Sequence, residues 1–163
     1  MTAKSPYLED PSRLADVIAA IQALGAYPKY MAQPETWSKR ISGTPDRARH
    51  WQKVFEEHPE FFRFSQQPAG SVSLIWRQQQ RKRYDADRLE VILHDQYILL
   101  DDAEKQRLSR EPLAPDQINA LIDVATNMHA RAIEHKREIR WWFAPLLGFL
   151  GAAAGGLLTG WWP

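Results

Sequence analysis

The C-terminal end of this 163-residue chain carries no Asp, Glu, Lys or Arg after Arg140, and this limits the folds available to it. As a helix, the stretch from Trp142 to Trp161 would be roughly 30 Å long, which matches the hydrocarbon core of a bilayer. Tryptophan favours the headgroup level, and pairs of it stand at both ends of the stretch: Trp141, Trp142, Trp161 and Trp162. Residues 141–163 therefore predict a single transmembrane tail anchor.

Basic residues in front of this segment predict its orientation. Arg131, Lys136, Arg137 and Arg140 precede it, whereas only Pro163 follows its last tryptophan. Basic residues are retained on the cytoplasmic side of a membrane. We therefore expect a single-pass protein of the inner, cytoplasmic membrane, with its N-terminal domain in the cytoplasm and the lipid bilayer as one partner.

Glycines within the segment indicate a second role for it. Small residues one helical turn apart let two helices approach closely in lipid. Two pairs have this spacing, Gly151 with Gly155 and Gly156 with Gly160. One interpretation is a homodimer formed through this helix. Glycine is also common in spans that do not pair, so both interpretations stay open.

The composition of the whole chain narrows the classes of function. With 21 basic and 20 acidic residues, the chain does not attract polyanions by bulk charge, so any affinity for nucleic acid must come from local patches. The absence of cysteine excludes disulfides, thiolate metal sites and cysteine nucleophiles. The length fits one modest domain in addition to the anchor.

Three helices are predicted after an N-terminal tail at residues 1–9. The first covers about residues 10–25, where Asp10 is a suitable cap and apolar residues recur at helical spacing. The second covers residues 35–41. The third covers about residues 44–58, with Thr44 as its cap and a proline at its first position.

A β-hairpin is predicted next, because two β-prone runs at residues 60–64 and 71–77 flank a loop containing Pro and Gly. Three helices followed by a hairpin, with the Ile41-Ser42-Gly43-Thr44-Pro45 turn between the second and third helices, resemble a winged-helix domain over residues 10–83. In that family the second and third helices form a helix-turn-helix, and the hairpin is the wing.

Residues 84–114 predict a connector with two apolar clusters, which form either strands or one buried helix. Residues 115–140 then predict a long amphipathic helix, whose apolar face must bury against the domain, a twin helix or a partner. The C-terminal part, from Leu108 through the tryptophans, resembles small uncharacterised bacterial tail-anchored membrane proteins. The expected fold class is α+β and mainly helical: a winged-helix-like domain, the long helix and a single C-terminal transmembrane helix.

The winged-helix resemblance implies that the third helix enters a DNA major groove. Acidic residues are mixed with the basic ones in this region, including Asp46, Glu56, Glu57 and Glu60, so a solvated surface of mixed charge is the simpler interpretation. The candidate contacts to nucleic acid or to a partner lie on this helix, beside the wing and just beyond it: Arg47, Arg49, His50, Lys53, Arg63, Arg77, Arg81, Lys82 and Arg83.

The basic run at residues 81–83 has two further interpretations. Basic residues close to a membrane gain roughly 1 kcal/mol each from anionic lipid, so the run could hold the domain against the inner leaflet. It is also compatible with an ordinary exposed strand end.

No set of residues predicts catalysis, a metal or a cofactor. The carboxylates of Asp101, Asp102 and Glu104 cluster in a polar connector, with no His or Lys spaced to orient them. His129 and His135 fall on different faces of the predicted long helix, so they cannot share a metal ion. The sequence contains neither a glycine-rich phosphate loop before a helix nor a nucleophile elbow.

The sequence therefore favours a non-enzymatic, membrane-anchored recognition or scaffold protein that binds a protein partner or a phage- or nucleoid-associated component. The alternative is a membrane-tethered winged-helix regulator that binds DNA. Because only Pro163 follows Trp162, no outer sensing domain is expected, and this favours recognition on the cytoplasmic face.

Overall fold

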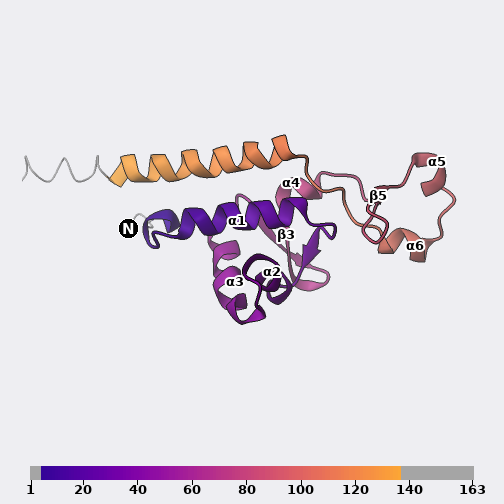
Figure 1. Ribbon diagram of the computed structural model, residues 1–163, viewed down its shortest axis with the longest axis horizontal. Helices are drawn as coiled ribbons and strands as arrows, with labels where there is room; N and C mark the ends of the chain where they lie inside the picture. Colours follow the sequence, from indigo (N-terminus) through magenta and orange to yellow (C-terminus); the bar gives the residue numbers. More distant parts are fainter. Residues whose placement is uncertain (1–4, 137–163) are drawn as a thin grey trace, which may run out of the picture. The chain divides into compact units, whose positions relative to one another are not determined.

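The computed structural model describes residues 5–136 of the chain (Figure 1). The chain divides into two compact units, residues 1–126 and residues 127–163. The elements named below belong to the first unit. In the second unit, residues 127–136 are helical.

The first long helix, α1, comprises Arg13–Ala26 and follows a short 3-10 turn, η1, at Pro6–Leu8. The predicted cap, Asp10, lies before the helix. Its carboxylate accepts hydrogen bonds from the backbone N–H and the hydroxyl of Ser12, at 2.9 and 2.7 Å. Asp10 therefore stabilises the turn that leads into α1, and the helix begins slightly later than predicted because the chain is held in this turn.

Two further helices follow, separated by a tight turn. Helix α2 comprises Pro34–Ser42, and helix α3 comprises Ala48–Glu57, preceded by the 3-10 turn η2 at Pro45–Arg47. Gly43 ends α2 with a φ of 76°, in the left-handed region that glycine tolerates. The Thr44 hydroxyl accepts a backbone hydrogen bond of 3.3 Å, so the predicted cap is confirmed.

A three-stranded antiparallel sheet completes this part of the fold, with the strand order β1-β3-β2. Strands β2 (Phe62–Gln66) and β3 (Ala69–Leu74) form the predicted hairpin. Strand β1 (Met31–Ala32) pairs with β3, and its two residues are too few to show a strand pattern in the sequence. After β3 the chain turns directly into the short helix α4 (Ile75–Gln78), so the last strand is shorter than predicted.

The hydrophobic core joins these helices to the sheet. It contains Ile21 of α1, Trp37 of α2, Phe55 of α3 and Leu74 of β3, all of them fully or almost fully buried. The indole N–H of Trp37 donates to the backbone O of Val72 at 3.0 Å, which satisfies the only polar atom of the buried ring. This hydrogen bond fixes α2 against the middle strand of the sheet.

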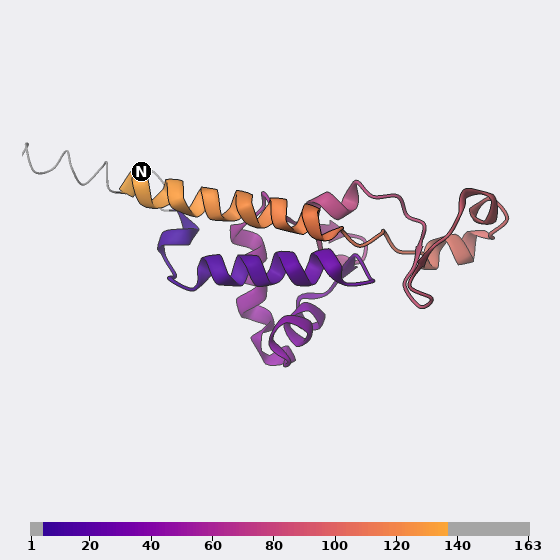
Figure 2. The ribbon, with the colours of Figure 1, turned by 45° about the horizontal axis from the view of Figure 1, so that its top comes forward.

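Residues 115–126 are helical and pack along α1 (Figure 1, Figure 2). Their side chains Leu121 and Ala125 belong to the hydrophobic core. Gly25 of α1 makes the close approach possible, because a Cβ atom on it would lie 3.0 Å from Cγ1 of Ile118. Over this stretch, the apolar face predicted for the long helix is therefore buried against the domain, which was one of the three alternatives.

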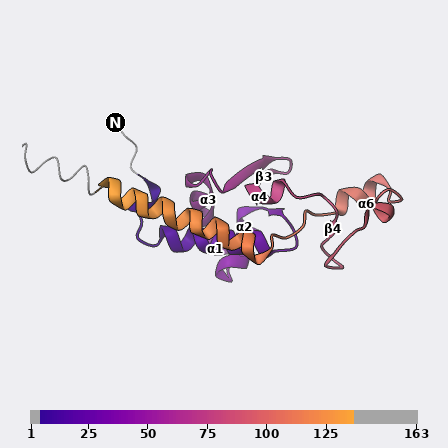
Figure 3. The same cartoon turned by 90° about the horizontal axis from the view of Figure 1, so that it is seen from above.

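Residues 84–108, here called the arm, contain only short elements (Figure 3). They are the two paired strands β4 (Tyr84–Asp85) and β5 (Glu90–Val91), the single-turn helix α5 (His94–Tyr97) and helix α6 (Asp102–Arg107). The two predicted alternatives were strands or one buried helix. The arm has two-residue strands and short helices instead.

The predicted transmembrane anchor requires a correction of the fold class. Among residues 5–136, no helix is long and apolar enough to cross a membrane. The helical stretch at residues 115–136 is long, but its charged residues, such as Asp116 and Asp123, are costly in a hydrocarbon core. The segment 141–163 lies outside the described residues. The transmembrane fold class is therefore wrong for the part of the chain that the structure describes, which is an α+β architecture.

Candidate interaction site

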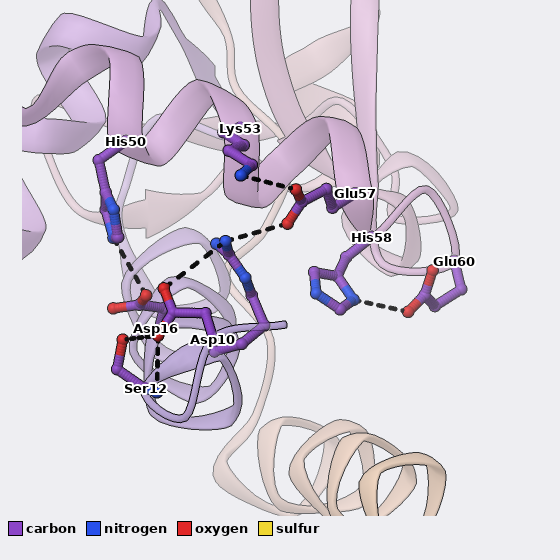
Figure 4. Close-up of polar contacts among 9 residues, drawn as sticks. Asp10, Ser12, Asp16, His50, Lys53, Glu57, His58 and Glu60 are labelled. Atoms are coloured by element: carbon purple, nitrogen blue, oxygen red, sulfur yellow. Dashed lines mark hydrogen bonds and ion pairs between the residues drawn. The ribbon is translucent and has the colours of Figure 1, made fainter. Parts of the chain in front are cut away.

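Basic side chains of α3 face acidic side chains near the start of α1 and at the end of α3 (Figure 4). The Nε2 atom of His50 lies 3.0 Å from the Asp16 carboxylate, and the Lys53 ammonium lies 3.4 Å from the Glu57 carboxylate. The other oxygen of Glu57 lies 3.0 Å from the guanidinium of Arg13, which is buried. The contacts of His50 with Asp16 and of Arg13 with Glu57 tie α1 to α3. Together with the pair of Lys53 and Glu57, they offset part of the positive charge that was predicted to contact nucleic acid.

Arg13 was not among the predicted site residues, although its position in the sequence carries a signal. It precedes Val17 and Ile21 by one and two helical turns, and all three residues share the buried face of α1. A charged residue on a buried face needs a partner, because burying an unpaired charge is costly. The Glu57 carboxylate is this partner, and the Asp10 carboxylate makes a second, longer contact with Arg13 at 3.8 Å.

A second polar group lies at the end of α3. His58 is buried, with its Nδ1 2.9 Å from the Glu60 carboxylate and its ring centroid 4.6 Å from that of Tyr7. Burial, and then the charge of Glu60, raise the pKa of the Tyr7 hydroxyl well above its ordinary value, so the phenol stays neutral. Because both rings are buried, they join η1 to the end of α3 and are not exposed to a substrate.

The structure places most of the predicted contacts of α3 and the hairpin on the surface. Arg47 and Arg49 are exposed at the start of α3, and Arg63 is exposed on β2. Lys53 is exposed as well, but it is paired, and His50 turns toward α1 with only 28 % of its side chain exposed. Within the described residues, three of these five, Arg47, Arg49 and Arg63, therefore carry a charge that no ion pair with a carboxylate offsets.

Arg77, predicted as a surface contact beside the wing, is buried in the interior instead. Burial lowers the pKa of Arg77 to about 10, which leaves the guanidinium charged at neutral pH. The prediction of an external contact at Arg77 is therefore wrong, because the side chain holds the C-terminal end of α1, whose carbonyls lack helical partners. The guanidinium donates to five backbone carbonyls, those of Leu24, Tyr27, Pro28, Lys29 and Arg110.

The basic run at residues 81–83 has a mixed role. The Lys82 ammonium donates to a backbone carbonyl of α6 at 3.1 Å. The Arg83 guanidinium lies 3.1 Å from Nδ1 of His94 and 5.0 Å from the ring centroid of Tyr97. Lys82 and Arg83 thus stabilise the arm, whereas Arg81 is exposed and available to a ligand.

A hollow of about 440 Å³, here called the basic pocket, lies where the arm leaves the domain. A pocket that combines positive charge with apolar walls suits a ligand that carries both a carboxylate and an apolar group. Its lining includes two arginines, a histidine, one carboxylate and two exposed apolar side chains: Arg81, Arg83, His94, Glu111, Val91 and Leu93.

Large apolar side chains of the arm are exposed to solvent. Leu99 is 84 % exposed and Leu93 is 67 % exposed. Exposed apolar side chains that gather in one short segment are expected at a binding surface. The sequence showed two apolar clusters in this segment, but it did not show which of their side chains are exposed. The five large apolar side chains of the arm that are exposed are Leu89, Val91, Leu93, Ile98 and Leu99.

The predicted carboxylate cluster caps helix α6. Asp101 accepts a hydrogen bond from the backbone N–H of Glu104 at 2.7 Å, and the Glu104 carboxylate accepts one from the backbone N–H of Asp101 at 2.9 Å. This reciprocal capping box stabilises the start of the helix. Within the described part of the chain, no group of three His, Cys, Asp or Glu side chains is arranged to hold a metal ion.

The remaining predicted site residues belong to the C-terminal segment and lie outside the described residues. They are the four interface tryptophans, Trp141, Trp142, Trp161 and Trp162, and the four glycines, Gly151, Gly155, Gly156 and Gly160.

No protein-family model, curated protein or solved structure matches this chain. Its function is therefore proposed from its own residues and their arrangement.

Proposed function

We propose that this protein is a non-enzymatic recognition module that binds a protein partner through its arm. The observation that carries this proposal is the set of five exposed apolar side chains on the arm, with Leu99 at 84 % exposure. Burying apolar surface gains roughly 25 cal/mol per Å², so a partner that covers these side chains gains affinity from them. The adjacent basic pocket offers polar groups that would orient the partner.

A winged-helix domain over residues 10–83 is the proposed support for the arm. Two observations favour it: the element order α1-β1-α2-α3-β2-β3, and a hairpin joined by a short third strand in the order β1-β3-β2. Winged-helix domains serve both as DNA-binding and as protein-binding modules. The fold therefore does not distinguish the two classes of partner, and the proposed partner is argued from the exposed residues.

DNA is the second candidate partner, because Arg47 and Arg49 are exposed at the start of α3. The charge balance of the same helix favours a protein partner instead. His50 and Lys53 lie 3.0 and 3.4 Å from carboxylates, and duplex binding draws its affinity from basic side chains that neutralise phosphates. The exposed apolar residues of the arm have no role in binding a phosphate backbone.

Site-specific photocrosslinking in the native cell tests the proposed function. A photoreactive amino acid is placed at Leu99 of the full-length chain and, as a matched control, at Glu35, which is exposed at the start of α2. We expect irradiation to join position 99, but not position 35, to one defined protein. Leu93→Asp should abolish that adduct without lowering the amount of folded protein, because Leu93 is 67 % exposed. A yield at position 99 no higher than at position 35 would overturn the proposal.

A further inference from the structure

Two surfaces of opposite charge lie on the arm and at the point where it joins the domain. The basic pocket combines the cations of Arg81 and Arg83 with apolar side chains. Further along the chain, exposed apolar residues stand directly before exposed carboxylates. This second surface, here called the acidic ridge, consists of Ile98, Leu99, Asp101, Asp102 and Glu104.

Within one copy of the chain, no residue of the acidic ridge lines the basic pocket. The lining of the basic pocket comes from residues 79–94 and from Glu111. Helix α5 is held by the Arg83 guanidinium, which lies 3.1 Å from Nδ1 of His94 and 5.0 Å from the ring centroid of Tyr97. The residues that follow α5 are left in solvent, with Leu99 84 % exposed. Asp101 and Glu104 also form the capping box of α6, whereas the exposed Asp102 of the ridge and the exposed Arg81 of the pocket are available to another molecule.

We propose that the partner of the arm is a second copy of this chain, whose acidic ridge binds in the basic pocket. This proposal rests on the proposed function, because it names the partner of the same surface. Two copies related by a two-fold axis would form the contact twice, since each copy contributes one pocket and one ridge.

The chemistry of the two surfaces is complementary. In the proposed contact, Ile98 and Leu99 of one copy cover Val91 and Leu93 of the other, so exposed apolar surface is removed from water on both sides. The carboxylates that follow the apolar pair then face the exposed guanidinium of Arg81. Opposite charges at the rim of an apolar contact fix its register and exclude wrong pairings.

Sedimentation velocity of the full-length protein over a series of concentrations tests this pairing. We expect a reversible monomer–dimer equilibrium for the wild type. Two charge reversals, Asp102→Arg on the ridge and Arg81→Glu at the pocket, should each raise the dimer dissociation constant about tenfold or more, because each places like charges together twice in a two-fold dimer. Arg49→Glu, an equally exposed reversal on α3, is the matched control and should leave the equilibrium unchanged.

Mixing the two charge-reversed proteins gives the sharpest test. In the heterodimer of Asp102→Arg with Arg81→Glu, both contacts again join opposite charges, so the mixture should dimerise more tightly than either protein alone. Circular dichroism should show unchanged folding, since both side chains are exposed. Leu99→Asp should also give a folded monomer. No second charge change should restore its dimerisation, because the substitution removes an apolar contact and not an ion pair.

Three results would overturn the second-copy proposal. They are a wild type that is monomeric at every concentration, a dimer that neither reversal weakens, and a mixture that remains monomeric. The photocrosslinking experiment separates this failure from that of the proposed function. An adduct between position 99 and a different protein, together with a monomeric wild type, would reject the second copy and keep the arm as a recognition surface.

Discussion

Two arginines of the described domain are buried, Arg13 and Arg77, and they are stabilised in different ways. Arg13 pairs with the Glu57 carboxylate at 3.0 Å, so its charge is offset by an opposite charge. Arg77 is surrounded by backbone carbonyls, whose dipoles offset its charge in place of an acid. Both side chains join segments that are distant in the sequence, and each is expected to matter for stability more than for binding.

Replacing Arg77 with Met should lower the free energy of unfolding by roughly 3 kcal/mol or more, because five backbone carbonyls lose their donor and each buried unsatisfied group costs about 1–3 kcal/mol. Arg77→Lys should recover only part of the loss, since an ammonium cannot reach so many carbonyls. Urea unfolding measures the free energy of unfolding of both variants. Arg81→Met, at an exposed position, is the control and should change stability by less than about 0.5 kcal/mol. Equal stability of the two Met variants would contradict this role.

Asp10 should make stability depend on pH in the acidic range. Hydrogen bonds from the side chain and then the backbone of Ser12 hold the pKa of Asp10 below its ordinary value of 3.8. A carboxylate with a lower pKa in the folded state stabilises the fold above pH 3.8, and this contribution is lost as the pH falls through the folded pKa. The difference in unfolding free energy between wild type and Asp10→Asn should therefore shrink on acidification. Urea unfolding at a series of pH values measures it, and a constant difference would refute the expectation.

Among the elements, α1 packs against η1, α2, α3 and β3. Its residues Val17, Ile21 and Leu24 are fully buried in the core, and its C-terminal end is bound by Arg77. The close contact with residues 115–126 depends on one glycine position. Packing at this contact is therefore sensitive to the addition of a single methyl group.

Gly25→Ala should lower the free energy of unfolding by about 1 kcal/mol, because the new Cβ would lie 3.0 Å from Cγ1 and 3.2 Å from Cδ1 of Ile118. Alanine favours the helix by up to about 1 kcal/mol, which offsets part of the clash. In an Ile118→Ala background the clash is absent, so the same change at Gly25 should become stabilising. Urea unfolding of the four proteins in this double-mutant cycle measures the reversal of sign, and the same sign in both backgrounds would contradict the contact.

At the scale of the whole molecule, positive charge is distributed and largely balanced. The chain has 21 basic and 20 acidic residues. In the described domain, two of the basic side chains of α3 are paired, and Arg77 is internal. A protein with this charge distribution has no strong field with which to attract a polyanion.

Full-length protein should therefore bind a mixed-sequence DNA duplex no more tightly than the non-specific range, with a dissociation constant of about 10⁻⁴–10⁻⁶ M at physiological salt. Fluorescence anisotropy across a series of salt concentrations measures this. Arg47→Ala combined with Arg49→Ala should change the affinity little. If binding is much tighter, falls steeply with salt and is lost in this double variant, the DNA-binding alternative is the correct one.

Sequence patterns predicted elements whose signals are local. The turn between α2 and α3 was predicted from Gly43 and the Thr44 cap, and the hairpin was predicted from two β-prone runs around a Pro/Gly loop. Strand β1 was not predicted, because its two residues become a strand only by pairing with β3. The arm was not resolved from sequence either, because apolar residues in short runs look the same whether a core covers them or not.

Local sequence signals were sufficient to locate the main helices and turns of the described domain, since caps, glycines and apolar spacing act within a few residues. It also supplied the basic residues that made a nucleic-acid surface plausible. Which of those charges are available depends on the packed fold, because the Asp16 partner of His50 and the carbonyl partners of Arg77 come from distant segments. Burial and pairing are properties of the packed chain, and at His50, Lys53 and Arg77 they support the proposal of a protein partner over DNA.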